Sequence, residues 1–293
     1  MHIMYAVLYI VIAVIIQLLA GNFPITLMRF PVNLILSLIW FFILFWLYRK
    51  ENLKIIRWLL SLKTSILSLV LFIAGCLVIG LFPQLSQADM AARNGVLAAL
   101  GCYDFATSWI FVAILWLLLS NLALVIFRAC VHYRKGRWRF LLNHIGLWLA
   151  LFGGFAGSCD TYVWNVPVYQ GVPTNRAYDG EGLEHRLNYN LELHSFSVER
   201  YPNGMPSSFE AVVYVGEGRK RAELTVNHPF HHKLGEDIYL SGYDTTGKMA
   251  ENYCVLQIVK QPWRYVTATG ICMMLLGAVL LFMRGPEYAG KLG

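Results

Sequence analysis

The chain has 293 residues, of which 57% are hydrophobic and only 14% are charged. Soluble globular domains carry about 25% charged residues, so we expect much of this protein's surface not to face water. A net charge of +7 can accompany nucleic-acid binding, but here the basic clusters lie beside hydrophobic segments and we expect no nucleic-acid partner. The six cysteines form no CxxC pair, which argues against a zinc site or a thioredoxin-like motif.

Six stretches of the chain have the length and composition of membrane-spanning helices. A span needs about 20 mostly apolar residues, and none of the six contains Asp, Glu, Lys or Arg. A charged side chain at mid-bilayer costs about 2.5–3.5 kcal/mol on insertion scales, so this absence is a strong signal. The predicted spans are Ile3–Ala20, Phe30–Tyr48, Thr64–Pro83, Thr107–Phe127, Phe140–Ser158 and Tyr265–Met283. The first lacks a basic n-region and an A-x-A site, which favours a membrane helix over a cleaved signal peptide.

The distribution of basic residues predicts the orientation of these spans. The loop between spans two and three, the loop between spans four and five, and the C-terminal tail together hold twelve basic and two acidic residues. The positive-inside rule places these segments, and with them both termini, in the cytoplasm. The segment from 159 to 264 has ten basic and thirteen acidic residues and falls on the outer side. The net positive charge of the chain therefore reflects its predicted membrane topology.

The long segment before the last span has the pattern of a β domain. Leu187, Tyr189, Leu191 and Leu193 alternate with polar residues, and similar runs occur at 209–215, 222–226, 237–240 and 253–259. Period-two runs of apolar residues separated by turn residues indicate antiparallel strands. The dipeptide Asn203-Gly204 is typical of a tight turn. The predicted fold is a membrane α-helical protein of about six spans, with a small sandwich-like all-β domain inserted outside the cell before the last one.

His144 is the one histidine inside a predicted span, about five residues from the cytoplasmic end at Arg139. An ionisable residue within a span is by default a functional hypothesis. A neutral imidazole is also a ligand for haem iron. In the alternative interpretation, His144 and Asn143 connect two helices by hydrogen bonds. The residues alone leave both open.

The other histidines and the cysteines give weaker signals. His228, His231 and His232 cluster in the predicted β domain, but neighbouring residues on a strand point to opposite faces and do not converge on one ion. Cys102 and Cys159 both lie close to the predicted outer interface, where a disulfide between them is possible.

Small residues in the last two spans predict close helix packing. Cys76 and Cys272, which lie in spans, are expected to pack as small apolar residues. The chain has no GxSxG, HExxH or phosphate-loop motif, so no catalytic residue is proposed from the sequence. The small residues are Gly153, Gly154, Ala156 and Gly157 in span five and Gly270 and Gly277 in span six.

Several short motifs occur in an order that is found in a known family. Three spans, an external domain and a closing span follow one another from about Ser61 onward. The motifs are Asn143-His144-Ile145-Gly146, Gly153-Gly154-Phe155-Ala156-Gly157, Tyr201-Pro202-Asn203-Gly204, and Val226-Asn227-His228-Pro229 followed by Gly235-Glu236-Asp237-Ile238-Tyr239. In this order and topology the chain resembles the ResB (CcsB) family of System II cytochrome c biogenesis.

The chain also departs from that family's pattern. Two additional spans precede the shared part, the external domain is short, and Lys260-Gln261-Pro262-Trp263 stands where the family has Asp-Pro-Gly. The expected organisation is two additional helices over 1–60, ResB-like spans three to five over 61–158, the β domain over 159–264, and the last span with a cytoplasmic tail over 265–293.

The resemblance implies a role in haem handling. ResB proteins act with a ResC (CcsA) partner to move haem across the membrane and attach it to the CxxCH motif of apocytochrome c. The partner's tryptophan-rich tract is absent here, so the chain corresponds to the separate ResB half, a non-catalytic or co-catalytic subunit of a cytochrome c synthase complex. The family's functional transmembrane histidine matches His144, which the resemblance makes a ligand of haem b. A second ligand would come from the partner or from water.

Two other functions compete with this one. A b-type electron carrier needs two facing histidines within the membrane, and the spans offer one. A transporter or signalling accessory subunit, whose external β domain binds a partner protein without a cofactor, remains the alternative.

Overall fold

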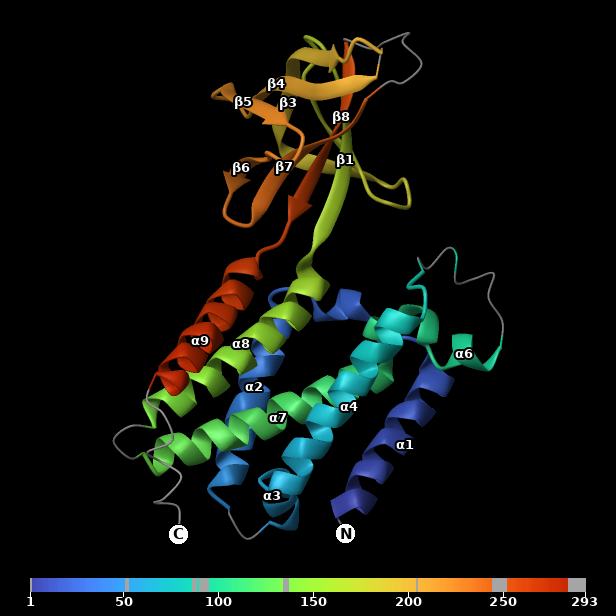
Figure 1. Cartoon of the computed structure of the whole chain (residues 1–293). Helices are drawn as coiled ribbons and strands as arrows, with labels where there is room; N and C mark the ends of the chain where they lie inside the picture. Colours follow the sequence, from blue (N-terminus) through green and yellow to red (C-terminus); the bar gives the residue numbers. More distant parts are fainter. Residues whose placement is uncertain are drawn as a thin grey trace. The chain divides into compact units, whose positions relative to one another are not determined.

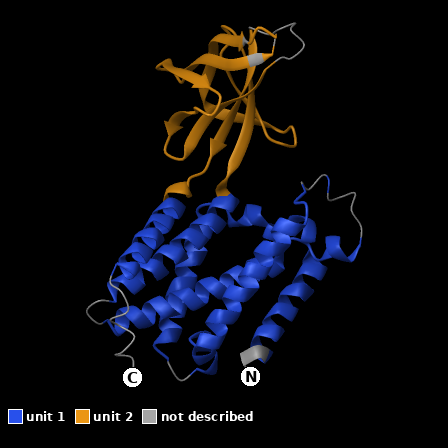
Figure 2. Cartoon of the chain, in the orientation of Figure 1, with its two compact units in different colours: residues 1–159, 266–293 blue, residues 160–265 orange. Residues whose placement is uncertain are grey.

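The computed structural model describes residues 2–50, 53–85, 89, 95–133, 137–203, 205–243 and 252–283. The chain divides into two compact units, residues 1–159 with 266–293 and residues 160–265 (Figure 2). The first unit is helical and the second is a β sheet (Figure 1). The C-terminal tail and loop residues 51–52 and 134–136, which contribute to the predicted orientation, lie outside the described residues.

Each predicted span coincides with a helix to within four residues at either end. Four of these helices, α4, α7, α8 and α9, are long and apolar enough to cross a membrane, while α1 and α2 are shorter apolar helices in their described parts. Several apolar helices fit a membrane protein, and the number of six spans stays a prediction. The helices are α1 (His2–Ala20), α2 (Val32–Tyr48), α4 (Leu62–Leu81), α7 (Trp109–Val131), α8 (Trp138–Asp160) and α9 (Arg264–Phe282), with short segments η1 (Ile25–Met28), α3 (Lys54–Leu59), α6 (Val96–Ala99) and η2 (Cys102–Thr107).

Helix α7 is the centre of the helical unit. In its most apolar 18-residue stretch 72% of the residues are buried, whereas in the corresponding stretches of α4, α8 and α9 at most 28% are. Polar side chains of three other helices bond to it: the Tyr9 hydroxyl and Trp148 Nε1 donate to its backbone carbonyls at 2.9 and 3.2 Å, and Trp40 Nε1 donates to Ser120 Oγ at 3.1 Å. Away from water such groups need internal partners, so these bonds fix how α1, α2 and α8 pack on α7.

Helices α8 and α9 pack through glycines. A Cβ atom added to Gly146 would lie 2.7 Å from the backbone oxygen of Gly270, and one added to Gly153 would lie 2.7 Å from a side-chain oxygen of α9. A Cβ on Gly277 would lie 2.6 Å from Asn143 Oδ1. Distances this short leave no room for a side chain, so the predicted close packing is confirmed for Gly153, Gly270 and Gly277.

Other predictions for small residues of the helical unit were wrong. A Cβ on Gly154 would meet nothing within 4 Å, so this glycine does not serve packing within the chain. Cys76 and Cys272 are exposed, because their helix faces turn away from the other described helices. Cys102 and Cys159 are both buried, and the disulfide considered for them is not formed.

The second unit is one antiparallel sheet in the order β5-β4-β3-β2-β1-β8-β7-β6. The small all-β domain is confirmed, but its described strands form one continuous sheet and not the sandwich we expected. Each of the five predicted runs falls on a strand, whereas β1, β2 and β6 were not predicted. The strands are β1 (Tyr162–Tyr169), β2 (Thr174–Tyr178), β3 (Glu184–Arg200), β4 (Pro206–Val215), β5 (Lys220–Thr225), β6 (Phe230–Lys233), β7 (Glu236–Tyr243) and β8 (Tyr253–Lys260).

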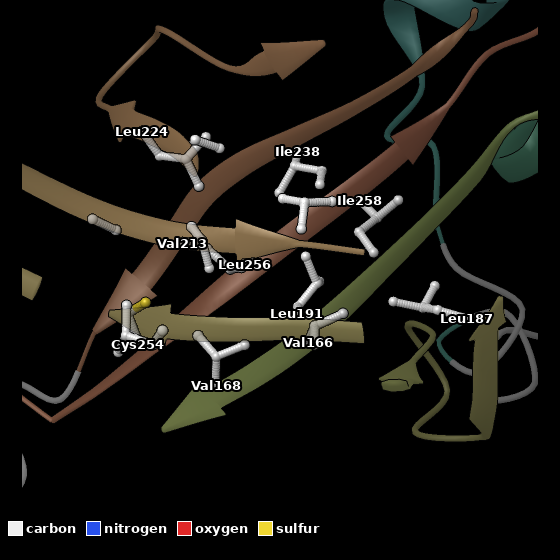
Figure 3. Close-up of a cluster of buried hydrophobic side chains, with 14 of the residues drawn as sticks. Val166, Val168, Leu187, Leu191, Val213, Leu224, Ile238, Cys254, Leu256 and Ile258 are labelled. Atoms are coloured by element: carbon white, nitrogen blue, oxygen red, sulfur yellow. The ribbon is translucent and has the colours of Figure 1, made fainter. Parts of the chain in front are cut away.

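The core of this unit lies on one face of the sheet (Figure 3). Leu191 of β3 and Leu256 of β8 are fully buried and share this core with Leu224 of β5 and Ile238 of β7. Strands β5 and β7 are far apart in the sheet order, so the sheet must curl to bring their side chains together. In the connection from β3 to β4, Asn203 Oδ1 accepts a hydrogen bond from the Met205 amide at 3.0 Å; Gly204 of the predicted turn lies outside the described residues.

Candidate functional site

His144 lies on α8, one turn after Phe140, and its ring is partly exposed. Its Nδ1 is 2.9 Å from the Phe140 backbone oxygen. A carbonyl oxygen can only accept a hydrogen bond, so Nδ1 must carry the proton and donate it. The lone pair of the neutral ring is then on Nε2, for which the described residues supply no hydrogen-bond partner. The backbone of α8 therefore fixes both the tautomer and the orientation of the imidazole.

An aromatic stripe surrounds His144 on α8. The Phe140 and His144 rings stack with centroids 3.8 Å apart and planes at 26°, and the Trp148 and Phe152 rings stack at 5.0 Å and 19°. These four residues recur every fourth position, so they lie along one face of the helix. Trp148 is held in turn by its bond to α7. His144 thus belongs to an apolar aromatic surface with one nitrogen available to a ligand.

The structure separates the roles of His144 and Asn143. Asn143 lies against Gly277 of α9 and belongs to the packing of the two helices. The hydrogen bonds of both residues go to their own helix: Asn143 Nδ2 donates to the Arg139 oxygen at 3.4 Å and His144 Nδ1 to the Phe140 oxygen. Asn143 therefore contributes to the contact of α8 with α9 by packing, and neither of these bonds connects the two helices.

These features of His144 fit an axial ligand to haem iron. Histidines that bind metals usually donate their second ring N–H to a carbonyl or carboxylate, and His144 makes this bond to Phe140. The residues that the structure describes contain no group of three or more His, Cys, Asp or Glu side chains able to hold a metal ion. His144 thus offers one ligand, and a low-spin haem would need a second.

The helical unit contains a cavity, and His144 is not among the residues that line it. It measures about 520 Å³, lies between α1, α2 and α7, and is lined by apolar and aromatic side chains such as Tyr9, Trp40, Trp109 and Trp116. No histidine or cysteine is among its lining residues. This cavity therefore provides neither a nitrogen nor a thiolate ligand to iron.

The histidines of the β unit do not converge. His231 Nδ1 is 2.6 Å from Asp237 Oδ1, and His232 points to the other face, where its Nε2 is buried without a partner among the described residues. His185 Nε2 is 2.8 Å from Asp179 Oδ2, and His228 is exposed in the turn after β5. The opposite directions expected for His231 and His232 are confirmed, and none of these residues builds a metal site.

A buried carboxylate in the β unit was missed by sequence reasoning. Asp237 is only 2% exposed, and its two oxygens accept hydrogen bonds from the Arg264 guanidinium and contact His231. Burial alone would raise the pKa of Asp237, but the bonds from Arg264 and His231 outweigh it and lower the pKa. The available signal was an Asp inside a predicted strand together with an Arg immediately before a predicted span.

Comparison with known proteins gives a family for part of the chain. The model of the ResB-like family matches residues 134–252, which include α8 with His144 and strands β1 to β7. The resemblance seen in the sequence is thereby confirmed over these residues, and the ResB/CcsB family is part of cytochrome c biogenesis. No curated protein matches the chain in sequence.

A likeness to solved structures was also found. The chain is similar to a structure titled Cytochrome c Heme Lyase CcmF, with 13% sequence identity and a TM-score of 0.37. The match covers 77% of this chain and 35% of that protein.

Proposed function

We propose that this chain, whose residues 134–252 belong to the ResB-like family, is a System II cytochrome c biogenesis subunit that binds haem through His144. With a ResC/CcsA-type partner it would pass haem across the bacterial inner membrane and support its attachment to apocytochrome c. Its β unit would lie outside the cell and both termini in the cytoplasm.

The observation that carries this proposal is the state of the His144 ring. Its Nδ1–H is bonded to the Phe140 carbonyl and its Nε2 has no partner in the described part of the chain. Phe140 is exposed and Trp148 is partly exposed, so these two rings offer a flat macrocycle an apolar surface beside His144, whereas Phe152 is buried. Haem b, when bound, supplies the group that is transferred; the chain's own residues bind and orient it.

A single histidine also explains why a partner is needed. Low-spin haem usually takes two axial ligands, and the spans of this chain provide one histidine. The second ligand would come from the ResC/CcsA-type protein, so haem should be retained mainly in the complex. The chain purified alone should show little haem absorbance, and the chain co-expressed with its partner should show more.

The test of the ligand is the His144→Ala variant. We expect it to abolish holocytochrome c formation, measured by haem staining of c-type cytochromes, while its level in the membrane stays normal. His144→Gly should recover part of the activity when imidazole is added, because free imidazole can replace the missing ligand but not a lost structural contact.

A matched control is His132→Ala. His132 Nδ1 also contacts the carbonyl four residues earlier, that of Arg128, at 3.3 Å, but it caps the end of α7 in the basic loop. This variant should mature cytochrome c normally. Wild-type maturation by His144→Ala would show that the ligand assignment is wrong.

A further inference from the structure

A second cavity lies within the β unit and its lining is cationic. It measures about 300 Å³ and is bordered by residues of β1, β3, β6, β7 and β8. Arg186, Lys233 and Lys260 line it, against a single carboxylate, Glu236. The lining thus carries a net positive charge, which favours an anion.

The cations of this cavity have little else to bind. Among the described residues no ion pair within 4.0 Å involves Lys233 or Lys260, and Arg186 contacts Glu184 only at 3.9 Å. Lys233 Nζ donates to Asn188 Oδ1 at 3.3 Å, a neutral partner. Their charges are therefore available to a bound anion.

The one carboxylate of the lining is already engaged. Glu236 Oε1 accepts a 2.8 Å hydrogen bond from the Tyr189 hydroxyl. Burial raises the pKa of Tyr189, and the neighbouring Glu236 raises it further, so the phenol remains a donor at neutral pH. This bond holds Glu236 beside Tyr189; the carboxylate keeps its charge, and the three cations of the lining outnumber it.

Apolar side chains line the inside of the cavity. Leu187 and Tyr189 of β3 are buried there, and Trp164 of β1 is half-buried, with its ring stacked on His185 at 5.1 Å and 16°. Leu234, in the turn between β6 and β7, is 82% exposed and lies at the rim with the three exposed cations. Apolar groups inside and cations at the rim together fit an anionic group carried by an apolar body.

We propose that this cavity binds the carboxylates of a porphyrin, with Lys233 and Lys260 on the carboxylates and Trp164 and Leu234 against the macrocycle. This inference rests on the proposed function, because haem is the porphyrin that the chain would handle. A volume of about 300 Å³ is at the lower end for small-molecule sites, so the cavity takes only one edge of the macrocycle, with its carboxylates at the exposed lysines of the rim. The β unit would then contact haem at a site separate from His144.

The probe is metal-free protoporphyrin IX, which cannot bind His144 through iron. Its binding to the purified full chain in neutral detergent is followed by fluorescence anisotropy. We expect Lys233→Gln/Lys260→Gln to weaken binding about tenfold or more, because charge-assisted hydrogen bonds contribute about 1.5–3 kcal/mol each and 1.4 kcal/mol is tenfold. The dimethyl ester of protoporphyrin should bind equally weakly to wild type and variant.

The matched control is Lys220→Gln/Arg221→Gln, which removes the same charge from β5 outside the cavity. It should bind protoporphyrin like the wild type, and both double variants should unfold at the wild-type temperature. Equal binding of acid and ester, or wild-type binding by the cavity variant, overturns the proposal. So does binding of anionic phosphatidylglycerol vesicles through Lys233 and Lys260 without binding of protoporphyrin, since the cavity would then serve lipid headgroups.

The two proposals fail separately. If His144→Ala matures cytochrome c normally while porphyrin binding still depends on the carboxylates, the proposed iron ligand is wrong and the proposed cavity site stands. If His144→Ala loses maturation while porphyrin binding does not depend on the carboxylates, the cavity site is wrong and the ligand stands.

Discussion

Asp237 shows how one residue of the β unit depends on its neighbours. It is buried beside β8 in register with Val259, and it holds its charge only because Arg264 and His231 bond to it. Removing one partner of a buried ion pair leaves the other charge without compensation. This carboxylate is therefore a site at which a small chemical change should have a large effect on stability.

We expect Asp237→Asn to destabilise the β unit by about 3 kcal/mol, the lower end for breaking a buried pair, because the Arg264 side chain is 26% exposed. Thermal unfolding of the full chain in detergent, followed by the β-sheet signal in circular dichroism, measures this. Glu223→Gln, at the exposed ion pair with Arg221, is the control and should change little.

Comparison of the wild type with Asp237→Asn also tests how the contribution of Asp237 to stability depends on pH. Since folding lowers the pKa of Asp237, its contribution is present above the ordinary carboxylate value of about 3.9 and is lost as the pH falls through the lower folded value. The difference between wild type and Asp237→Asn should therefore be constant near pH 7 and shrink below about pH 4. A difference that stays constant down to pH 3 would contradict the assigned role.

At the scale of elements, the contact of α8 with α9 positions the helix that carries His144. A Cβ atom on Gly270 would lie 2.5 Å from the Ala150 backbone nitrogen and 2.6 Å from the Gly146 oxygen. Backbone atoms cannot move aside as the end of a side chain can, so the helices would have to separate. This contact is the most constrained packing feature of the helix that holds the proposed ligand.

We predict that Gly270→Ala lowers the stability of the helical unit by about 1–3 kcal/mol, the usual cost of overpacking. Gly154→Ala on the same α8 is the control, because its Cβ would meet nothing within 4 Å. Thermal unfolding in detergent compares the two variants with the wild type. A wild-type unfolding temperature for Gly270→Ala would mean that the two helices pack less closely than the structure has them.

The sequence was informative where physical constraints are local. Absence of charge over about 20 residues is needed for any span, so hydropathy located the helices to within four residues. Strands β2 and β6 are too short to show an alternating pattern, and Pro167 interrupts that of β1. The pairing of Asp237 with Arg264 and the cavity around Lys233 and Lys260 depend on strand register, which no local pattern contains.

The candidate site, too, could be predicted from the sequence only in part. His144 was found because a histidine in a span is rare and costly. The direction of its Nε2 and the aromatic stripe along α8 required the helix itself. The neighbours Gly153 and Gly154 cannot be told apart from the sequence, yet only Gly153 faces α9. Small residues suggest that helices pack closely, but they do not identify the face.

At the scale of the whole molecule, the proposed function depends on how many helices cross the membrane. The 17 residues of α2 rise about 26 Å at 1.5 Å per residue, slightly less than the roughly 30 Å of a hydrocarbon core. Helix α1, with 19 residues, rises about 28 Å and is also slightly short. If both span, the loop around Asn22 is outside the cell; if they enter and leave on one side, it is not.

Reporter fusions decide this. A phosphatase that is active only outside the cytoplasm, inserted after Asn203 in the exposed turn between β3 and β4, should be active, and one inserted after His132 between α7 and α8 should be silent. A fusion after Asn22 should also be active if α1 and α2 each cross. Silence at Asn22 with activity at Asn203 would leave a four-span protein whose β unit is still outside. Silence at Asn203 would place the β unit in the cytoplasm, and haem could then not be delivered through it to an apocytochrome outside the cell.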